Sequence, residues 1–183
     1  MRKKPTRIVA PAEYDLPLSF HKEIGRIMVR WAYFEQTIRR LAWDVLGVDD
    51  RLGRISVRDP RIDSRIEMIG EIAFLRNIKI DPQILVTLQT RAAEVLRWRD
   101  LLAHGVWIPR GKIWLVQMVS GTYPKNYEAK HRKRRVNPEG VNVDIDGLRT
   151  ISRGIKILIE LALELREQIE PQLRPSPEIH RKR

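Results

Sequence analysis

The sequence predicts a mainly α protein, an up-and-down bundle of four long helices with a small β-hairpin inserted before the last helix. Three observations predict it. Apolar residues recur every three or four positions over four long stretches, which is the period of a helix that buries one face. Asp-Pro pairs precede two of these stretches, and such pairs are typical of helix starts. A short β-prone segment separates the third stretch from the fourth.

The first helix is predicted to begin near Pro17 and Ser19 and to stop at Gly47. A strict alternation of four- and three-residue steps joins its apolar positions. These positions are Phe20, Ile24, Ile27, Trp31, Phe34, Ile38, Leu41 and Val45.

The second and third helices are predicted to open at Asp59-Pro60 and Asp81-Pro82. The second ends near Asn77 and carries Ile62, Ile66, Ile69 and Ala73 on one face. The seam of the third reads Leu85, Leu88, Ala92, Val95, Arg99 and Leu102. Gly105 is expected to adopt a left-handed conformation that closes this helix, which places His104 in the last turn.

A β-hairpin is predicted over about 106–119, around a Pro-Arg-Gly-Lys turn, and a basic polar loop over about 120–142. The fourth helix is expected to start near Asp144 or Asp146. Its core face carries Leu148, Ile151, Ile155, Leu158, Ala162, Leu165 and Ile169. It is also apolar off that face, at Ile157, Ile159, Leu161 and Leu163, so we expect it either to be central in its own bundle or to be shared with another chain.

A length of 183 residues fits one domain. We assign the helical domain to 18–174, a basic N-terminal extension to 1–17 and a basic C-terminal tail to 175–183. No apolar run follows the basic N-terminus and no uninterrupted apolar stretch could cross a bilayer, so we expect a cytoplasmic protein that does not engage membranes.

The formal charge of +12 favours polyanionic partners, of which nucleic acid is the leading class. Part of this charge stands in runs such as KHRKRR, which are equally typical of solvated, non-binding segments. The absence of cysteine excludes disulfides, thiolate metal sites and cysteine nucleophiles. Neither histidines at metal-ligand spacing nor a phosphate-binding glycine loop occurs, and the two aspartates of the GVDDRLG turn are too few for a metal site. We therefore expect neither metal nor cofactor.

Three polar residues crowd the end of the third helix. Arg99 occupies a seam position, where an unpartnered charge is unfavourable. Asp100 and His104 are four residues apart and so share a helix face, and the long side chain of Arg99 reaches toward them. A histidine beside a guanidinium suits phosphodiester chemistry, since histidine transfers protons while arginine neutralises charge that grows on phosphate.

The segment Arg99-Asp-Leu-Leu-Ala-His104 resembles the signature of HEPN-domain ribonucleases, which is an arginine, often followed by a polar residue, with four to six residues before a histidine. The resemblance implies an α-helical homodimer whose two motifs form one composite site that cuts RNA without a metal. It further implies catalytic roles for Arg99 and His104, an orienting role for Asp100, and a function as a toxin or in defence against phage, with an antitoxin as a further partner.

Spacing alone is weak evidence, since Arg97 with His104 and Arg174 with His180 also fit it. Arg99 stands out because it lies on the apolar seam of a long helix that ends at the histidine. Glu35, beside the apolar stripe of the first helix, is a candidate partner that neutralises Arg99, but an ordinary surface glutamate is the stronger interpretation.

The basic loop mixes cations with tyrosines, as RNA-binding segments do. Its candidate nucleic-acid-binding residues are Lys125, Lys130, Arg132, Lys133, Arg134 and Arg135. Trp107 and Trp114 in the hairpin could stack on bases, but packing is the stronger interpretation.

Three functional hypotheses follow. The first is a metal-independent endoribonuclease that acts as a homodimer. The second is a non-catalytic helical module that binds nucleic acid or a partner protein through its basic loop. The third is an antitoxin-like or structural dimerisation module in which the two His104 side chains lie far apart.

Overall fold

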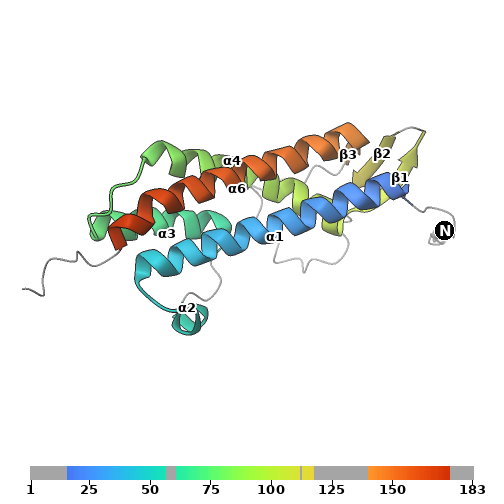
Figure 1. Cartoon of the computed structure of the whole chain (residues 1–183). Coiled ribbons are helices and arrows are strands. Elements are labelled where there is room, and N and C mark those ends of the chain that lie inside the picture. The colour runs from blue at the N-terminus through green and yellow to red at the C-terminus, as the bar shows by residue number, and fades with distance from the viewer. Residues whose placement is uncertain (1–15, 57–60, 112, 118–139, 174–183) are drawn as a thin grey trace, which may run out of the picture.

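Helices form most of the computed structural model, which describes residues 16–56, 61–111, 113–117 and 140–173 (Figure 1). In chain order the elements are α1 (Leu18–Leu46), α2 (Asp50–Ser56), α3 (Ile62–Leu75), α4 (Pro82–His104), β1 (Val106–Arg110), β2 (Ile113–Gln117), β3 (Val141–Val143) and α6 (Ile145–Leu173). Four long helices pack together and a small antiparallel sheet precedes the last, which confirms the predicted fold class. None of the described helices is long and apolar enough to span a membrane.

The first helix, α1, begins and ends where the sequence predicts. The backbone N–H of Phe20 donates to the carbonyl of Pro17 (2.8 Å), and Gly47 closes the helix in the left-handed region with a φ of 73°. Seven of the eight predicted apolar residues are buried, and the eighth, Ile24, packs partly buried against the same core. The seam of α1 is therefore the spine of the bundle.

The second long helix, α3, buries its whole predicted face. Its core residues are Ile62, Ile66, Ile69 and Ala73. The chain leaves the helix through Asn77, whose φ of 55° is left-handed. The predicted opening at Asp59-Pro60 lies outside the described residues.

The third long helix, α4, opens as predicted, since the Asp81 carboxylate accepts the N–H of Gln83 (2.8 Å). Its end corrects the prediction, because Gly105 is extended (φ −76°, ψ 151°) and not left-handed. A Cβ at Gly105 would collide with the Leu101 carbonyl oxygen and with the Val116 side chain of β2. Glycine is needed there for a close approach of α4 to the sheet, not for its backbone freedom.

The helices α1 and α6 lie side by side and run parallel, away from the sheet (Figure 1). Near the sheet, Nη1 of Arg30 donates to Oγ of Ser152 (2.7 Å). Toward the other end, Asp44 of α1 lies in the electrostatic field of Arg166 and Glu170 of α6. The contacts advance along both helices in the same direction.

Two further hydrogen bonds give the directions of α3 and α4. Nη1 of Arg76, directly after α3, donates to the carbonyl of Val45 near the end of α1 (2.5 Å), so α3 also runs parallel to α1. The N–H of Asp81 donates to Gln168 near the end of α6 (2.9 Å), so α4 runs antiparallel to α6. The up-and-down order thus holds for α3, α4 and α6, whereas α1 and α3 are parallel because the connection through α2 returns the chain toward the middle of the bundle.

The predicted hairpin is formed by β1 and β2, with Gly111 at its turn in the left-handed region (φ 65°). A third strand, β3, pairs antiparallel with β2, so the end of the predicted 120–142 loop is a strand. Trp114, Val116 and Val143 are buried on the face that joins the helical core. The sheet therefore closes one end of the bundle, next to the end of α4.

The predicted GVDDRLG turn is instead the start of the short helix α2. The Asp49 carboxylate accepts the N–H groups of Arg51 (2.9 Å) and Leu52 (2.8 Å), which caps the helix. Gly53 lies so close to the ring of Trp43 that a Cβ would overlap it. The helix α2 covers Trp43, which is why this tryptophan on the outer side of α1 is buried.

The last helix, α6, begins after Asp144, whose carboxylate accepts the N–H of Gly147 (2.7 Å). Of its residues off the core face, Ile159 and Leu161 pack partly buried against the core, whereas Ile157 is 39% exposed. Because α6 packs on both α1 and α4, its second apolar face serves largely its own bundle.

Candidate functional site

The last two turns of α4 carry the predicted site. Leu102 is buried in the core, whereas the Arg99 side chain on the same seam is 31% exposed. The Nε atom of Arg99 is buried and has no hydrogen-bond partner within the described part of the chain. A buried donor that lacks a partner typically costs about 1–3 kcal/mol, so this arginine is not explained by stability.

The helix α3 does not extend along the whole bundle, and Arg99 lies beyond the part that it covers. Val95, one turn before Arg99, is level with Gly154 of α6, where an added Cβ would lie 3.8 Å from the valine. α3 has 14 residues and its end is fixed beside the end of α1, so it covers only the half of the bundle away from the sheet (Figure 1). Arg99 lies toward the sheet, at a level of the bundle that α3 does not reach.

Asp100 holds the guanidinium of Arg99. Nη1 of Arg99 donates to Oδ1 of Asp100 at 2.8 Å, and the Asp100 side chain is 45% exposed. Asp100 shares a helix face with His104, but its carboxylate binds Arg99. Among hydrogen bonds between described residues, none joins Asp100 to His104. The ion pair therefore turns Arg99 from the seam toward the face that carries the histidine.

His104 is the last residue of α4 and is exposed. The N–H of the next residue, Gly105, donates to the Leu101 carbonyl (2.8 Å), so the backbone around the histidine is held by the helix. Within the described part of the chain, no hydrogen bond or ion pair occupies the imidazole. It is accessible to a ligand on the same side as Asp100.

Glu35 is the predicted supporting residue on α1. It is half-buried on α1, and the ion pairs between described residues include none that joins it to Arg99. Glu35 lies five residues beyond Arg30, on the part of α1 that leads away from the sheet, whereas Arg99 lies one turn toward the sheet from Val95. The Arg99 partner is Asp100, and the support by Glu35 stays a prediction.

The tryptophans pack and do not form an open aromatic platform. Trp31 is buried in the core, and Trp114 is 8% exposed. The ring of Phe20 lies 6.3 Å from both Trp107, edge to face, and Trp114, tilted. These contacts join α1 to the sheet, which agrees with the packing interpretation.

The predicted nucleic-acid-binding residues lie outside the described residues, because 118–139 is not described. The two ends of that segment are described. Gln117 ends β2. A Cβ added at Gly140 would lie 3.1 Å from the carbonyl oxygen of Val116. The two described residues that flank this segment, Gln117 and Gly140, thus lie at the sheet that follows His104.

Three other features of the described residues bear on possible sites. A shallow cavity of about 470 Å³ between α4 and α6 is lined by Thr90, Arg91, Glu94, Val95 and Gly154, and no predicted site residue lines it. Within the described part of the chain, no group of three or more potential ligands is arranged for a metal ion. Burial raises the pKa of Asp44, near the other end of the bundle, and the neighbouring Arg166 opposes this effect.

Sequence reasoning missed a cluster of arginines on α1 and α6. Arg26 and Arg30 are four residues apart on α1, and Arg149 and Arg153 are four apart on α6. This spacing places each pair on one helix face. The signal was present in the sequence, but only the parallel packing of α1 and α6 brings the two pairs together.

No family model, curated protein or solved structure matches this chain. The likeness to HEPN ribonucleases consequently rests on the motif from Arg99 to His104 and on its place at the end of a bundle helix.

Proposed function

We propose that this chain is a metal-independent endoribonuclease of the HEPN type, in which Arg99 and His104 are catalytic and Asp100 positions Arg99. The observation that carries the proposal is the 2.8 Å ion pair of Arg99 with Asp100, a residue that shares a helix face with His104. A charged side chain on an apolar seam, with a buried donor left unpaired, is better explained by a ligand than by folding.

The Arg99 guanidinium keeps donors for a phosphate. Its bond to Asp100 uses Nη1, and the hydrogen bonds between described residues include none from Nη2. Guanidinium groups bind phosphate oxygens through two parallel donors, and the planar group is already held in place by the carboxylate. Arg99 is therefore suited to stabilise the charge that develops on a phosphate under attack.

RNA supplies its own nucleophile. A base removes the proton of a ribose 2′-hydroxyl, whose oxygen forms a bond to the adjacent phosphorus. The bond from phosphorus to the 5′-oxygen breaks, and an acid protonates the leaving oxygen. The products are a 2′,3′-cyclic phosphate and a 5′-hydroxyl, with no other reactant consumed. His104 is the side chain at this site that can act as the base or the acid.

Such cleavage uses one base and one acid, and the motif contains a single histidine. The resemblance to HEPN proteins implies a homodimer, in which the second copy supplies the second histidine. A composite site would also explain why the residues of one chain lie on an open surface and not in the α4–α6 cavity. The homodimer, and roles as a toxin with an antitoxin partner or in phage defence, belong to this proposal.

The test is incubation of the purified protein with labelled RNA in the presence of EDTA. The proposal predicts fragments that end in a 2′,3′-cyclic phosphate, and a rate at least about 100-fold lower for His104→Ala. A matched RNA with a 2′-deoxyribose at the cleavage position should stay intact. Unchanged cleavage by His104→Ala, or cleavage of the deoxy substrate, would contradict the mechanism.

The competing function is a non-catalytic module that binds nucleic acid through the basic segment. A variant that replaces Lys130, Arg132, Lys133, Arg134 and Arg135 with glutamine distinguishes the two. The module hypothesis predicts loss of RNA binding in this variant and no cleavage by the wild type. The ribonuclease proposal predicts cleavage by the wild type that requires His104.

A further inference from the structure

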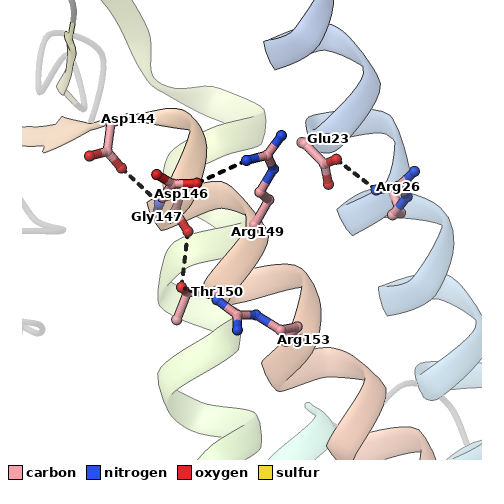
Figure 2. Close-up of polar contacts among 8 residues, drawn as sticks. All are labelled: Glu23, Arg26, Asp144, Asp146, Gly147, Arg149, Thr150 and Arg153. Carbon is pink, nitrogen blue, oxygen red and sulfur yellow. Dashed lines mark hydrogen bonds and ion pairs between the residues drawn. The ribbon is translucent and has the colours of Figure 1, made fainter.

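Four arginines gather where α1 and α6 pack near the sheet, and we call them the α1–α6 arginine cluster: Arg26, Arg30, Arg149 and Arg153. Figure 2 shows Arg149 and Arg153 on successive turns of α6, with Arg26 on the neighbouring α1. Since α1 and α6 are parallel and Arg30 binds Ser152, the two pairs lie at the same level of the bundle. The cluster is therefore a feature of the fold that neither helix has alone.

Two of the four guanidinium groups are neutralised by carboxylates. Nη1 of Arg26 lies 2.6 Å from Oε1 of Glu23, and Nη1 of Arg149 lies 2.9 Å from Oδ1 of Asp146. Both pairs are formed within a single helix. Arg26 and Arg149 are 41% and 57% exposed, so each still presents donors to solvent.

The other two, Arg30 and Arg153, have only uncharged partners among the described residues. Arg30 donates to the carbonyl oxygen (3.1 Å) and the hydroxyl (2.7 Å) of Ser152. Arg153 donates to the hydroxyl of Thr150 (3.1 Å). The cluster thus carries two positive charges that no described carboxylate balances.

Glu23 of α1 is the buried carboxylate beside the cluster. Glu23 is 7% exposed, and its buried Oε2 has no hydrogen-bond partner among the residues that the structure describes. Figure 2 shows its carboxylate turned toward Arg26, with the dashed ion pair between them. A buried carboxylate is unfavourable without a cation nearby, and Arg26 supplies one through its 2.6 Å ion pair with Glu23.

We propose that the α1–α6 arginine cluster binds consecutive phosphates of an RNA strand. Arginines four residues apart on a helix place their Cβ atoms about 5–6 Å apart, a spacing similar to that of successive phosphates in a single strand. Two parallel helices provide two such pairs. Arg30 is held by buried Ser152, so part of the ordering of the side chain precedes binding.

RNA is chosen as the ligand because of the proposed ribonuclease function, and in this the inference rests on that function. The site itself is separate from the motif. Arg30 faces α6, whereas Arg99 lies on α4, closer to the sheet than the part of the bundle that α3 covers. The cluster would hold the strand at a distance from the cut and would add affinity without taking part in the chemistry.

The experiment measures RNA binding by fluorescence anisotropy in the His104→Ala background, so that no cleavage intervenes. The test variant is Arg30→Gln with Arg153→Gln. The matched control is Arg51→Gln with Arg54→Gln on α2, which removes the same charge at the other end of the bundle. Thermal unfolding of each variant verifies that the fold is intact.

The proposal predicts that the test pair weakens binding and lowers the slope of log affinity against log salt by about 1.4, because each phosphate contact to a single strand contributes about 0.7. The control pair should leave the slope within about 0.3 of the parent, a margin smaller than one such contact. Arg30→Lys with Arg153→Lys should retain most of the slope, since the charge remains. Equal slopes for the test and control pairs would overturn the inference.

Binding of a polyglutamate peptide that requires Arg30 and Arg153, with RNA binding unaffected by them, would also overturn it and assign the cluster to an acidic protein segment. The readout keeps the two proposals distinct. If the test pair lowers the salt slope but the wild type never cleaves RNA, RNA binding by the cluster is supported and the ribonuclease function is contradicted. If the wild type cleaves RNA but the test pair leaves the salt slope unchanged, the ribonuclease function is supported and RNA binding by the cluster is contradicted.

Discussion

Asp100 holds Arg99 by a 2.8 Å ion pair, although the two residues are neighbours in the chain and their Cα–Cβ bonds point to different sides of α4. The long arginine stem crosses from the seam to the face that Asp100 shares with His104. Half-exposed ion pairs contribute little to stability, typically about 0–1 kcal/mol. The consequence of this pair is the orientation of a guanidinium.

Asp100→Asn tests that orientation. Asparagine retains the shape but loses the charge that draws Arg99 across the helix, and a misplaced catalytic group commonly reduces the rate by about 10- to 100-fold. We expect kcat to fall with little change in KM, and the free energy of unfolding to stay within about 0.5 kcal/mol. The measurement is steady-state RNA cleavage.

Asp63→Asn is the control for Asp100→Asn, because Asp63 also pairs with a nearby arginine, Arg61, at 2.9 Å. It should leave kcat unchanged. If both substitutions lower kcat equally, Asp100 has no specific role in positioning Arg99.

Arg99→Met separates stability from activity. Methionine fills the seam, removes the buried Nε that lacks a partner and buries apolar surface, so we expect a gain of about 1 kcal/mol in the free energy of unfolding. Cleavage should be lost. Urea unfolding measures the first effect, and a destabilised variant would show that Arg99 serves the fold.

Gly105 and Gly25 should respond to alanine in opposite ways. At Gly105 a Cβ overlaps the Leu101 carbonyl and the Val116 side chain, and we expect a loss of about 1–3 kcal/mol. At Gly25, in the first half of α1, nothing lies within 4 Å of the added Cβ. Alanine should stabilise the helix there by about 0.5–1 kcal/mol.

Chemical denaturation of both variants decides the glycine prediction. A neutral Gly105→Ala would mean that α4 does not approach the sheet as closely as described.

Asp44 gives a pH dependence with a definite sign. Burial raises its pKa above the ordinary value of 3.8, so the folded state favours the protonated form and its contribution to stability is lost as the pH rises through the raised pKa. The amide side chain introduced by Asp44→Asn cannot ionise. We therefore expect Asp44→Asn to be more stable than the wild type near neutral pH, with a difference that shrinks as the pH falls toward the ordinary value.

Thermal unfolding of Asp44→Asn and the wild type at several pH values tests this, with Asp63→Asn as an exposed reference. A wild type that is the more stable protein at neutral pH would show that attraction to Arg166 outweighs the effect of burial.

Local signals predict the long helices well. The apolar alternation of α1 and the Asp81-Pro82 start of α4 are properties of neighbouring residues, and the structure contains both. The short elements depend on distant contacts. α2 is stabilised by the fit of Gly53 against Trp43, and β3 by pairing with β2, and neither contact is visible in a local window. The parallel order of α1 and α6 is equally a tertiary property.

The same contrast between local signals and distant contacts applies to the site. Its position on α4 could be predicted because an arginine on an apolar seam is visible in the sequence. The use of Asp100 as the arginine's partner could not, because adjacent residues on a helix ordinarily face apart. The left-handed conformation predicted for Gly105 is wrong, since the constraint on this glycine comes from Val116 on the sheet.

The measurement that tests the central claim most directly compares two arginines that both have the motif spacing to His104. Arg97 is exposed on the outside of α4, whereas Arg99 lies on the seam and binds Asp100. In single-turnover RNA cleavage with EDTA, we predict that Arg97→Ala retains the wild-type rate and that Arg99→Ala loses about 100-fold or more. Equal rates for the two variants, or a greater loss for Arg97→Ala, would contradict the assignment of Arg99 as the catalytic arginine.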